Sequence, residues 1–267
     1  MRTQLTDRFR EIIYAESGIA LSPRKEALLS ARLGKRMRAL GIASYDEYLR
    51  YLETEQGVDE IVPLLDAVST NVTSFYREAS HFDVVRDTME TWVGQGQRRF
   101  RFWSAACSTG EEPYSLAMTL LDEFDMSALD TKILATDIST NALAHAKAGV
   151  YEHRKVGGIP AEQLDRHLVR AATDGEPVYT VSPEVRKLVT FHRMNLSNPP
   201  FPMSGPLDMV FCRNVMIYFD NEVRRQLLSE IARLLRPGGY LFVGHAESLA
   251  GMLSGLKYVS PSVYIKP

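Results

Sequence analysis

Two carboxylates follow a run of small residues at the first strand-to-helix turn that the sequence predicts. In the segment WSAACSTGEEPYS, residues 103–115, Glu111 and Glu112 stand directly after Gly110. Small residues let the backbone approach a ligand closely, and acidic groups in the place of a phosphate-binding lysine suit a cationic ligand. A sulfonium that carries an α-amino group is such a ligand. The alternative is that both glutamates only stabilise a helix N-terminus through the helix dipole.

Asp137 strengthens the case for a ligand site. It ends the second predicted strand, 25 positions after Glu112, where an acidic residue can accept hydrogen bonds from both hydroxyl groups of a ribose. Asp137 can instead cap the next helix, but Ser139 and Thr140 are better placed for that. The two acidic positions together indicate a site for a positively charged nucleoside.

A later strand end carries further polar groups. The segment FCRNVMIYFD, residues 211–220, ends a predicted strand beside the point where the strand order of such a sheet reverses. Arg213, Asn214 and Tyr218 are therefore expected to face the reacting centre. For Tyr218, the alternative is a core aromatic ring whose hydroxyl group is satisfied internally.

The polar segment STNVTSFYRE, residues 69–78, joins the two halves of the chain. Polar residues at such dense spacing rarely belong to a core. Asn71, Thr73 and Arg77 are therefore candidates for the lining of a cleft between domains, where ligand sites often form. The alternative is an ordinary capped linker.

Residues 1–70 are predicted to form a small helical domain without strands. Apolar residues recur there at helical spacing, and Ser44 stands where it would cap a helix. Another helix is expected to begin with Ser22 as its N-cap and Pro23 at its first position. The expected helices are Arg8–Glu16, Arg24–Leu40, Tyr45–Glu53 and Asp59–Val68.

Residues 98–267 alternate short apolar runs with helical patterns, and residues 71–97 are expected to link them to the helical domain. Because parallel strands need crossover helices, this alternation predicts an open, mostly parallel, Rossmann-like α/β sheet. A segment at about 168–195 breaks the alternation and is expected to form a small antiparallel β insertion. Strands are expected at Arg99–Ala106, Lys132–Ile138, Val189–Met194, Leu207–Cys212 and Tyr240–Gly244, helices at Tyr114–Phe124, Asn141–Ala148 and Asn221–Leu235, and a turn at Pro237–Gly239.

The composition is that of an ordinary globular protein, 45% hydrophobic and 24% charged, with a net charge of −2. This balance does not favour a nucleic-acid partner, and no apolar run is long enough to span a bilayer. The N-terminal residues carry charges where a signal peptide needs an apolar core. Two cysteines, Cys107 and Cys212, are expected to be buried thiols, not a disulfide. We expect a cytoplasmic protein that is not inserted in a membrane and acts as a monomer.

Five segments together resemble the CheR family of chemoreceptor methyltransferases: NVTSFYR, WSAACSTGEEPYS, ATDIST, FCRNVMIYF and LLRPGGYLFVGHAES. They follow the family's order and roughly its spacing, and the resemblance covers nearly the whole chain. LLRPGGYLFVG is also a helix–turn–strand passage common in class I methyltransferases. Two positions depart from the family pattern, since Tyr76 stands where phenylalanine is usual and Cys107 replaces a small residue. Neither departure removes an expected polar contact.

The resemblance implies a class I methyltransferase that transfers a methyl group from S-adenosylmethionine to glutamate side chains in the cytoplasmic regions of chemotaxis receptors, leaving S-adenosylhomocysteine. It places Arg77 and Tyr218 beside the transferred methyl group. The β insertion matches the position of a family subdomain that binds a receptor tail in some members. Contacts with S-adenosylmethionine are implied for Asn71, Thr73, Arg77, Glu112, Asp137, Asn195, Leu196, Arg213 and Asn214.

Basic residues outnumber acidic ones between positions 24 and 50. This excess predicts a basic surface on a nearly neutral protein, which suits docking on an acidic helical bundle around the target glutamates. The alternative for any single residue is a solvated charged face. The residues expected to dock on the receptor are Arg32, Lys35, Arg36 and Arg38.

Other classes of protein fit the sequence less well. The main alternative is a non-catalytic module that binds adenosylmethionine and signals by contact. A nicotinamide oxidoreductase would need the glycine fingerprint G-x-G-x-x-G, and a nucleic-acid methyltransferase is expected to carry an aromatic base-clamping motif at 213–216. A metal enzyme is not expected, because the histidines lack ligand spacing. They are His81, His145, His153, His167, His192 and His245.

Overall fold

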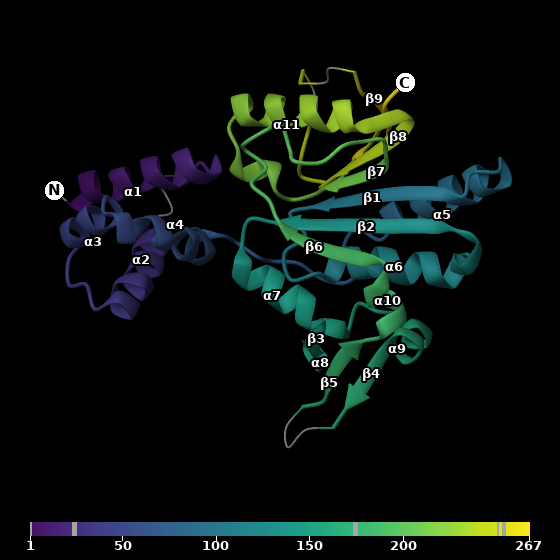
Figure 1. Ribbon diagram of the computed structural model, residues 1–267, viewed down its shortest axis with the longest axis horizontal. Coiled ribbons are helices and arrows are strands. Elements are labelled where there is room, and N and C mark those ends of the chain that lie inside the picture. The colour runs from purple at the N-terminus through teal and green to yellow at the C-terminus, as the bar shows by residue number, and fades with distance from the viewer. Residues whose placement is uncertain (1, 23–25, 173–175, 250, 253–254) are drawn as a thin grey trace.

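A seven-stranded sheet forms the centre of the computed structural model, which describes residues 2–22, 26–172, 176–249, 251–252 and 255–267 (Figure 1). Its strands are β1 (Arg99–Ala105), β2 (Asp130–Asp137), β6 (Val189–Arg193), β7 (Leu207–Cys212), β8 (Leu235–Val243), β9 (Lys257–Ser260) and β10 (Val263–Ile265). They lie in the order β6-β2-β1-β7-β8-β10-β9. The first five in this order are parallel, and β10 is antiparallel to both of its neighbours. This confirms the predicted mostly parallel α/β sheet.

Helices cover both faces of the sheet, as parallel strands require. They are α5 (Ser80–Gly94), α6 (Glu111–Glu123), α7 (Thr140–Ala148) and α11 (Asn221–Leu234). Successive residues of β1 point to opposite faces, so Phe102 packs into the core beneath α5 and α6, whereas Trp103 packs into the core beneath α11. None of the described helices combines the length and the apolar character needed to cross a lipid bilayer.

The strand β7 has the bounds that the sequence predicts, and all of its residues are buried. Apart from Asp208, its residues are apolar, as expected of a strand with both faces covered. The pairing of β8 with β7 jumps from Leu235 to Tyr240, so the predicted turn at Pro237–Gly239 is an irregularity inside β8. Cys107 and Cys212 are buried and unpaired, as predicted.

The described residues of the N-terminal domain form four helices, which have a core of their own around the fully buried Phe9. Ser44 caps α3 as predicted. Thr54 caps α4, which therefore begins before the predicted Asp59. The predicted helix start at Pro23 lies outside the described residues. The helices are α1 (Arg2–Ser17), α2 (Glu26–Leu40), α3 (Tyr45–Leu52) and α4 (Glu55–Val68).

The segment expected to be a linker, residues 71–97, contains the helix α5. Phe82, Val85 and Met89 recur on one face of α5 and are buried in the core of the sheet domain. The linker prediction is therefore wrong for Ser80–Gly94, because this helix belongs to the sheet domain.

The insertion forms a separate three-stranded antiparallel sheet of order β3-β5-β4 (Figure 1). It consists of β3 (Val150–Glu152), α8 (His153–Val156), α9 (Ala161–His167), β4 (Leu168–Ala171), β5 (Val178–Val181) and α10 (Pro183–Lys187). The predicted limits, 168–195, are wrong at both ends. They leave out β3, whose three residues are too few to show a strand pattern, and they include β6, which pairs with β2 in the main sheet.

Candidate active site

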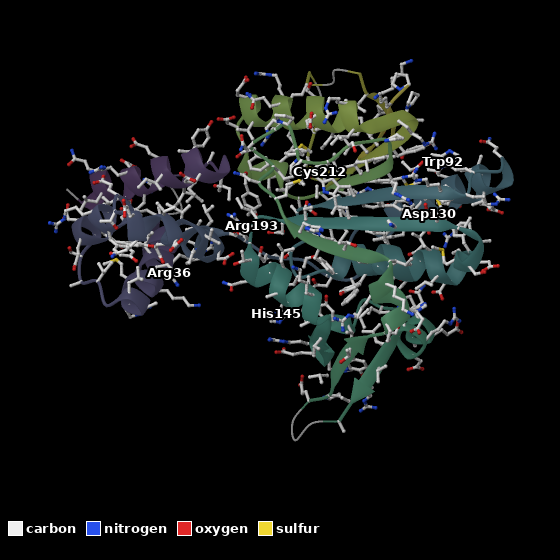
Figure 2. The ribbon with its side chains drawn as sticks, viewed as in Figure 1. Arg36, Trp92, Asp130, His145, Arg193 and Cys212 are labelled. Carbon is white, nitrogen blue, oxygen red and sulfur yellow. The ribbon has the colours of Figure 1, made fainter. Side chains whose placement is uncertain are left out.

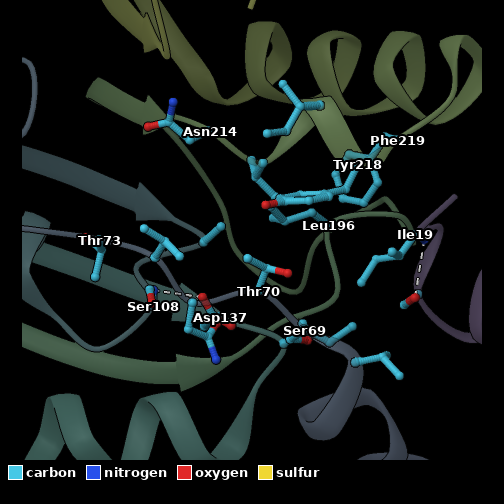
Figure 3. A pocket seen from close by; sticks show the side chains of 18 of the residues that line it. Ile19, Ser69, Thr70, Thr73, Ser108, Asp137, Leu196, Asn214, Tyr218 and Phe219 are labelled. Carbon is cyan, nitrogen blue, oxygen red and sulfur yellow. Dashed lines mark hydrogen bonds between the residues drawn. The ribbon is translucent and has the colours of Figure 1, made fainter. Parts of the chain in front are cut away.

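A cavity of about 410 Å³ opens at the carboxyl ends of β1, β2 and β7, and the N-terminal domain covers one side of it (Figure 3). The strand order reverses at β1, which lies between β2 and β7. Sheets of this kind bind their ligands at such a point. All residues predicted to bind the ligand or act on it line this cavity: Asn71, Thr73, Arg77, Glu112, Asp137, Asn195, Leu196, Arg213, Asn214 and Tyr218.

The turn between β1 and α6 brings its backbone to the cavity. Ala106, Ser108 and Gly110 have left-handed φ angles of 63°, 50° and 96°. A Cβ atom at Gly110 would lie 2.9 Å from the Cβ atom of Ala146 on α7. The positive φ and the close approach both favour glycine at this position.

The two glutamates at the start of α6 have different surroundings. Glu112 lines the cavity, and its carboxylate accepts hydrogen bonds from Ser104 Oγ at 2.6 Å and Arg213 Nη1 at 3.0 Å. Burial raises the pKa of Glu112, while Arg213 and Ser104 act in the opposite direction. Glu111 is fully buried and accepts a hydrogen bond from the hydroxyl group of Thr109. The prediction of a cationic ligand therefore applies to Glu112 alone.

Asp137 is buried at the end of β2, beside the turn (Figure 3). Its two oxygens accept hydrogen bonds from the amides of Ser108 at 2.8 Å and Ser139 at 2.9 Å. The alternative role for Asp137 was to cap α7. In the structure, Ser139 is the N-cap of α7. Burial raises the pKa of Asp137. Because a carboxylate has about four acceptor positions, Asp137 keeps capacity for hydroxyl donors of a ligand.

Arg213 is almost fully buried, and two carboxylates hold its guanidinium group. Its Nε and Nη2 atoms donate to Glu78 Oε2 at 3.1 and 3.0 Å, and its Nη1 atom donates to Glu112. Its Nη2 atom also donates to the backbone carbonyl of Arg77. The sequence predicted a cofactor contact for Arg213. In the structure, the hydrogen bonds of Arg213 connect the end of β7 to residues 77–78 and to α6.

Two glutamates that the sequence analysis did not single out support the site. Glu78 anchors Arg213, and Glu247 accepts hydrogen bonds from the amides of Asn214 and Gly244, both at 2.7 Å. Glu247 thereby fixes the backbone of Asn214, which has a left-handed φ of 57°. Both glutamates lie within or directly beside segments that carry the family resemblance. This position is the signal by which the sequence could have identified them.

Arg77 and Tyr218, the two residues expected beside the reacting methyl group, are half-buried and line the cavity. Arg77 donates a hydrogen bond to the carbonyl of Val72 at 3.0 Å. Tyr218 ends the short helix η3 (Met216–Tyr218), and its ring reaches the cavity (Figure 3). Tyr218 is therefore not a residue of the closed core, which was the alternative for this side chain.

The end of α1 and the loop after it hold the N-terminal domain against the sheet domain. The amide of Ala20 donates to the carbonyl of Tyr218 at 2.8 Å. The side chain of Asn195 donates to the carbonyl of Glu16 at 2.8 Å, and Tyr14 donates to Asp220. These hydrogen bonds bring the helical domain over the cavity, beside Tyr218.

Two of the four residues predicted to dock on a receptor, Arg32 and Arg36, have partners within the helical domain; Figure 2 labels Arg36 on this domain. Arg36 forms two hydrogen bonds with the buried carboxylate of Glu60, at 2.8 and 2.6 Å. Arg32 donates to the carbonyl of Val68 and lines the cavity. Arg32 and Arg36 are therefore half-buried with internal partners, whereas the other two predicted docking residues, Lys35 and Arg38, are exposed.

The sheet, with its antiparallel edge and its acidic residues after β1 and β2, defines an S-adenosylmethionine-dependent class I methyltransferase. Within this class, the chain belongs to the CheR methyltransferase family. Residues 5–69 match the domain described as "CheR methyltransferase, all-alpha domain". Residues 71–265 match "CheR methyltransferase, SAM binding domain". Together, the two matches confirm the resemblance seen in the sequence motifs.

Relatives match over most of their own length. The chain is 38% identical over 243 residues to a chemotaxis protein methyltransferase of Escherichia coli (strain K12), covering 91% of this chain and 84% of that protein. It is 40% identical over 250 residues to chemotaxis protein methyltransferase 1 of Pseudomonas aeruginosa, covering 90% of this chain and 89% of the relative. It is 35% identical over 266 residues to a chemotaxis protein methyltransferase of Borreliella burgdorferi, covering 97% and 93%.

Proposed function

We propose that this protein methylates glutamate side chains in the cytoplasmic regions of chemotaxis receptors, forming methyl esters. The observation that carries the proposal is the placement of Arg77 and Tyr218 in one cavity with Glu112 and Asp137. The two acidic residues suit a cationic nucleoside, and the arginine and the phenol suit a visiting carboxylate. The named relatives are chemotaxis methyltransferases, which supports a receptor as the substrate.

The cavity fits S-adenosylmethionine in size and in chemistry. A volume of about 410 Å³ lies within the range usual for small-molecule sites. Asp137 would accept hydrogen bonds from the ribose hydroxyl groups, and Glu112 would face the positively charged part of the ligand. Bound S-adenosylmethionine supplies an electrophilic methyl group whose bond to sulfur breaks, with its electron pair going to sulfur, as the bond to the carboxylate oxygen forms.

The residues of this chain have to align and desolvate the nucleophile. A glutamate of ordinary pKa is already ionised at neutral pH, so the reaction needs no general base. Arg77 and Tyr218 would hold the incoming carboxylate by charge and by a hydrogen bond, and the N-terminal domain beside Tyr218 would limit access of water. Alignment and removal of water are then the main contributions to the rate.

Tyr218→Phe and Arg77→Ala are each expected to lower kcat by about 10- to 100-fold. A hydrogen bond to a charged group contributes about 1.5–3 kcal/mol, and each 1.4 kcal/mol corresponds to a factor of ten. Methyl transfer to purified receptor and the Kd for S-adenosylhomocysteine should be measured separately for each variant. Tyr218→Phe is expected to leave the Kd unchanged, whereas a large rise in Kd for Arg77→Ala would mean that Arg77 binds the carboxylate of the cofactor. Wild-type turnover in both variants would show that the assignment is wrong.

The reaction itself can be tested with S-adenosylmethionine that carries a labelled methyl group. Incubation with purified chemoreceptor is expected to give label that is released by alkali, because methyl esters are alkali-labile. Binding of S-adenosylhomocysteine without any transfer to receptors would favour the alternative function, a non-catalytic module that binds adenosylmethionine. Stable label would exclude a glutamate ester as the product.

Reversing the charge at Lys35 and Arg38 together is expected to weaken receptor binding by about 3- to 30-fold at low salt, and less at high salt. Exposed charges of this kind act mainly through long-range complementarity with an acidic partner, which salt screens. Lys257→Glu is the matched control, because Lys257 is an exposed lysine on β9, at the far edge of the sheet. Affinity for receptor and for S-adenosylhomocysteine should both be measured. Equal receptor affinity of the double variant and the control would argue against this docking surface.

A further inference from the structure

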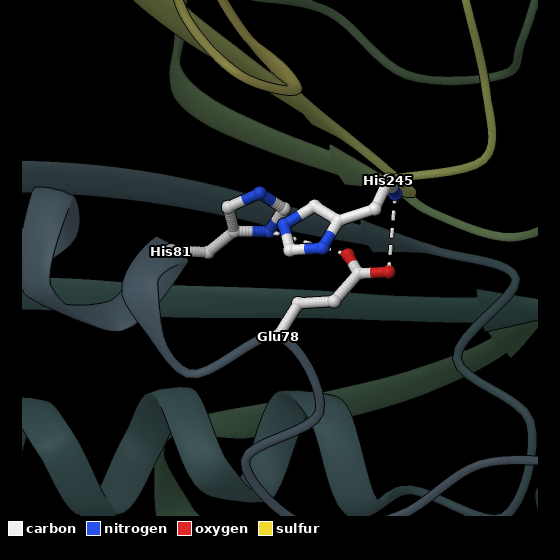
Figure 4. Close-up of side chains that lie close together, drawn as sticks. All are labelled: Glu78, His81 and His245. Carbon is white, nitrogen blue, oxygen red and sulfur yellow. Dashed lines mark hydrogen bonds and ion pairs between the residues drawn. The ribbon is translucent and has the colours of Figure 1, made fainter.

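Glu78, His81 and His245 form a cluster beside the active-site cavity (Figure 4). Glu78 lies in the turn before α5, His81 is in the first turn of α5, and His245 follows β8, so the cluster joins segments that are distant in the sequence. Each residue offers one oxygen or nitrogen atom, and these three atoms lie within 4.8 Å of one another. His81 is 1% exposed and His245 is exposed, so one side of the cluster is closed and the other is open to solvent.

The imidazole ring of His81 is buried without a hydrogen bond. Neither of its ring nitrogens has a hydrogen-bond partner among the described residues. The ring packs against Phe242, with centroids 5.4 Å apart, and its Nδ1 atom lies 3.7 Å from Glu78 Oε2. A neutral imidazole has one ring nitrogen with a free lone pair, and this is the form that binds a metal ion. A buried polar group left unpaired in this way is unfavourable unless a further group satisfies it.

Glu78 also retains capacity to bind another group. Its Oε2 atom accepts two hydrogen bonds from Arg213, and its Oε1 atom accepts one from the amide of His245 at 3.1 Å. Since a carboxylate has about four acceptor positions, one remains. The cluster therefore presents a carboxylate and two imidazoles to one point.

We propose that Glu78, His81 and His245 form a binding site for a divalent transition-metal ion, of which Zn²⁺ is the best match. Two imidazoles and one carboxylate are a known three-residue ligand set for zinc, and the fourth position would face solvent on the side of His245. Metal–ligand bonds of about 2.0–2.2 Å place neighbouring donors roughly 3.4 Å apart. Donors that now lie within 4.8 Å of one another have to approach by up to about 1.4 Å, and the exposed ring of His245 has room to turn.

The proposed site differs from the expectation that the protein is not a metal enzyme. That expectation depended on ligand spacing along the sequence, and the fold supplies the third ligand from the turn after β8. The ion would share Glu78 with Arg213, which lines the cavity of the proposed methyl-transfer site. The site does not depend on the proposed receptor substrate.

The test is direct metal binding to the full chain, without a histidine tag and after treatment with a chelator. Calorimetric titration with Zn²⁺ is expected to show one site with a Kd of roughly 10 µM or tighter. His245→Ala is expected to weaken this site by about 100-fold or more, because it removes a ligand but keeps the amide that donates to Glu78. His145→Ala is the matched control, since His145 is exposed on α7 and away from the cluster (Figure 2).

Spectroscopy with Co²⁺ gives a second readout. Bound Co²⁺ is expected to show the intense visible absorption of a site with four ligands in the wild type and in His145→Ala, and to lose it in His245→Ala. His245→Ala should bind S-adenosylhomocysteine with wild-type affinity, which shows that the variant is folded, because His245 does not line the cavity. Absence of a stoichiometric Zn²⁺ site in the wild type, or a site that survives His245→Ala, would overturn the proposal.

Discussion

Asp137→Asn is expected to weaken the binding of S-adenosylhomocysteine by at least about 100-fold. We propose that the carboxylate of Asp137 accepts hydrogen bonds from the ligand's two ribose hydroxyl groups, while it holds the amides of Ser108 and Ser139. Hydrogen bonds to a charged acceptor contribute about 1.5–3 kcal/mol each, so the loss of two corresponds to a factor of 100 or more. The side-chain amide of this variant also points an N–H donor at one of the two backbone N–H groups. The two donors repel each other, and this disturbs the turn before α6. Calorimetry with S-adenosylhomocysteine measures the effect.

A matched control for this variant lies at the other end of the same strand. Asp130→Asn changes an exposed aspartate of β2 that pairs with Arg101, far from the cavity (Figure 2). It is expected to leave the affinity for S-adenosylhomocysteine unchanged. If Asp137→Asn bound the ligand as tightly as Asp130→Asn, the proposed role of Asp137 in holding the ribose would have to be abandoned.

The sequence predicted the location of the candidate site because that location follows from strand geometry. Parallel strands end at the same edge of a sheet, so polar residues after separate strands must meet there. Glu112, Asp137 and Asn214 follow three strands that are central in the sheet, and all three line one cavity. The limits of β7 were predictable because a strand covered on both faces is mostly apolar, and every residue of β7 except Asp208 is apolar.

The ion-pair partners of charged residues could not be predicted from the sequence. Arg213 and Glu78 are 135 positions apart, and no local pattern indicates that they form an ion pair. Arg36 appeared to belong to a basic surface because its partner, Glu60, is contributed by another helix and is buried. His245 lies beside His81 only because of the fold, so the spacing of the histidines along the chain does not predict this contact.

Short elements and domain limits were missed because they carry little periodicity. Only three residues form β3, and their pattern differs little from that of a loop. The helix α5 does show buried residues at helical spacing, but the polar segment before it favoured a linker. Both features concern how the domains are delimited, and neither changes which residues reach the cavity.

Arg213→Met is expected to lower the free energy of unfolding by about 3–5 kcal/mol at pH 7.5. Arg213 is the partner of two carboxylates, Glu78 and Glu112, and its side chain is 2% exposed. Methionine keeps most of the apolar stem but leaves two negative charges without a cation in a buried place. Loss of the bond to the carbonyl of Arg77 also releases the backbone beside the proposed catalytic arginine. Denaturant unfolding measures the stability.

Arg233→Met is the control, because Arg233 pairs with Glu230 through an exposed guanidinium and a much smaller change is expected.

The pH dependence of Arg213→Met separates loss of a counter-charge from loss of packing. In the wild type, the pKa of Glu78 is lowered, so its contribution to stability is present above its unfolded pKa and is lost as the pH falls through its folded pKa. Burial raises the pKa of Glu112, so protonation of this carboxylate as the pH falls favours the folded state. Without Arg213, both pKa values should lie above their unfolded values, and protonation should then stabilise the folded state. The deficit of Arg213→Met relative to the wild type should therefore shrink between pH 7.5 and about pH 5.5. A deficit that stays constant over this interval would show that packing, and not the two carboxylates, accounts for the role of Arg213.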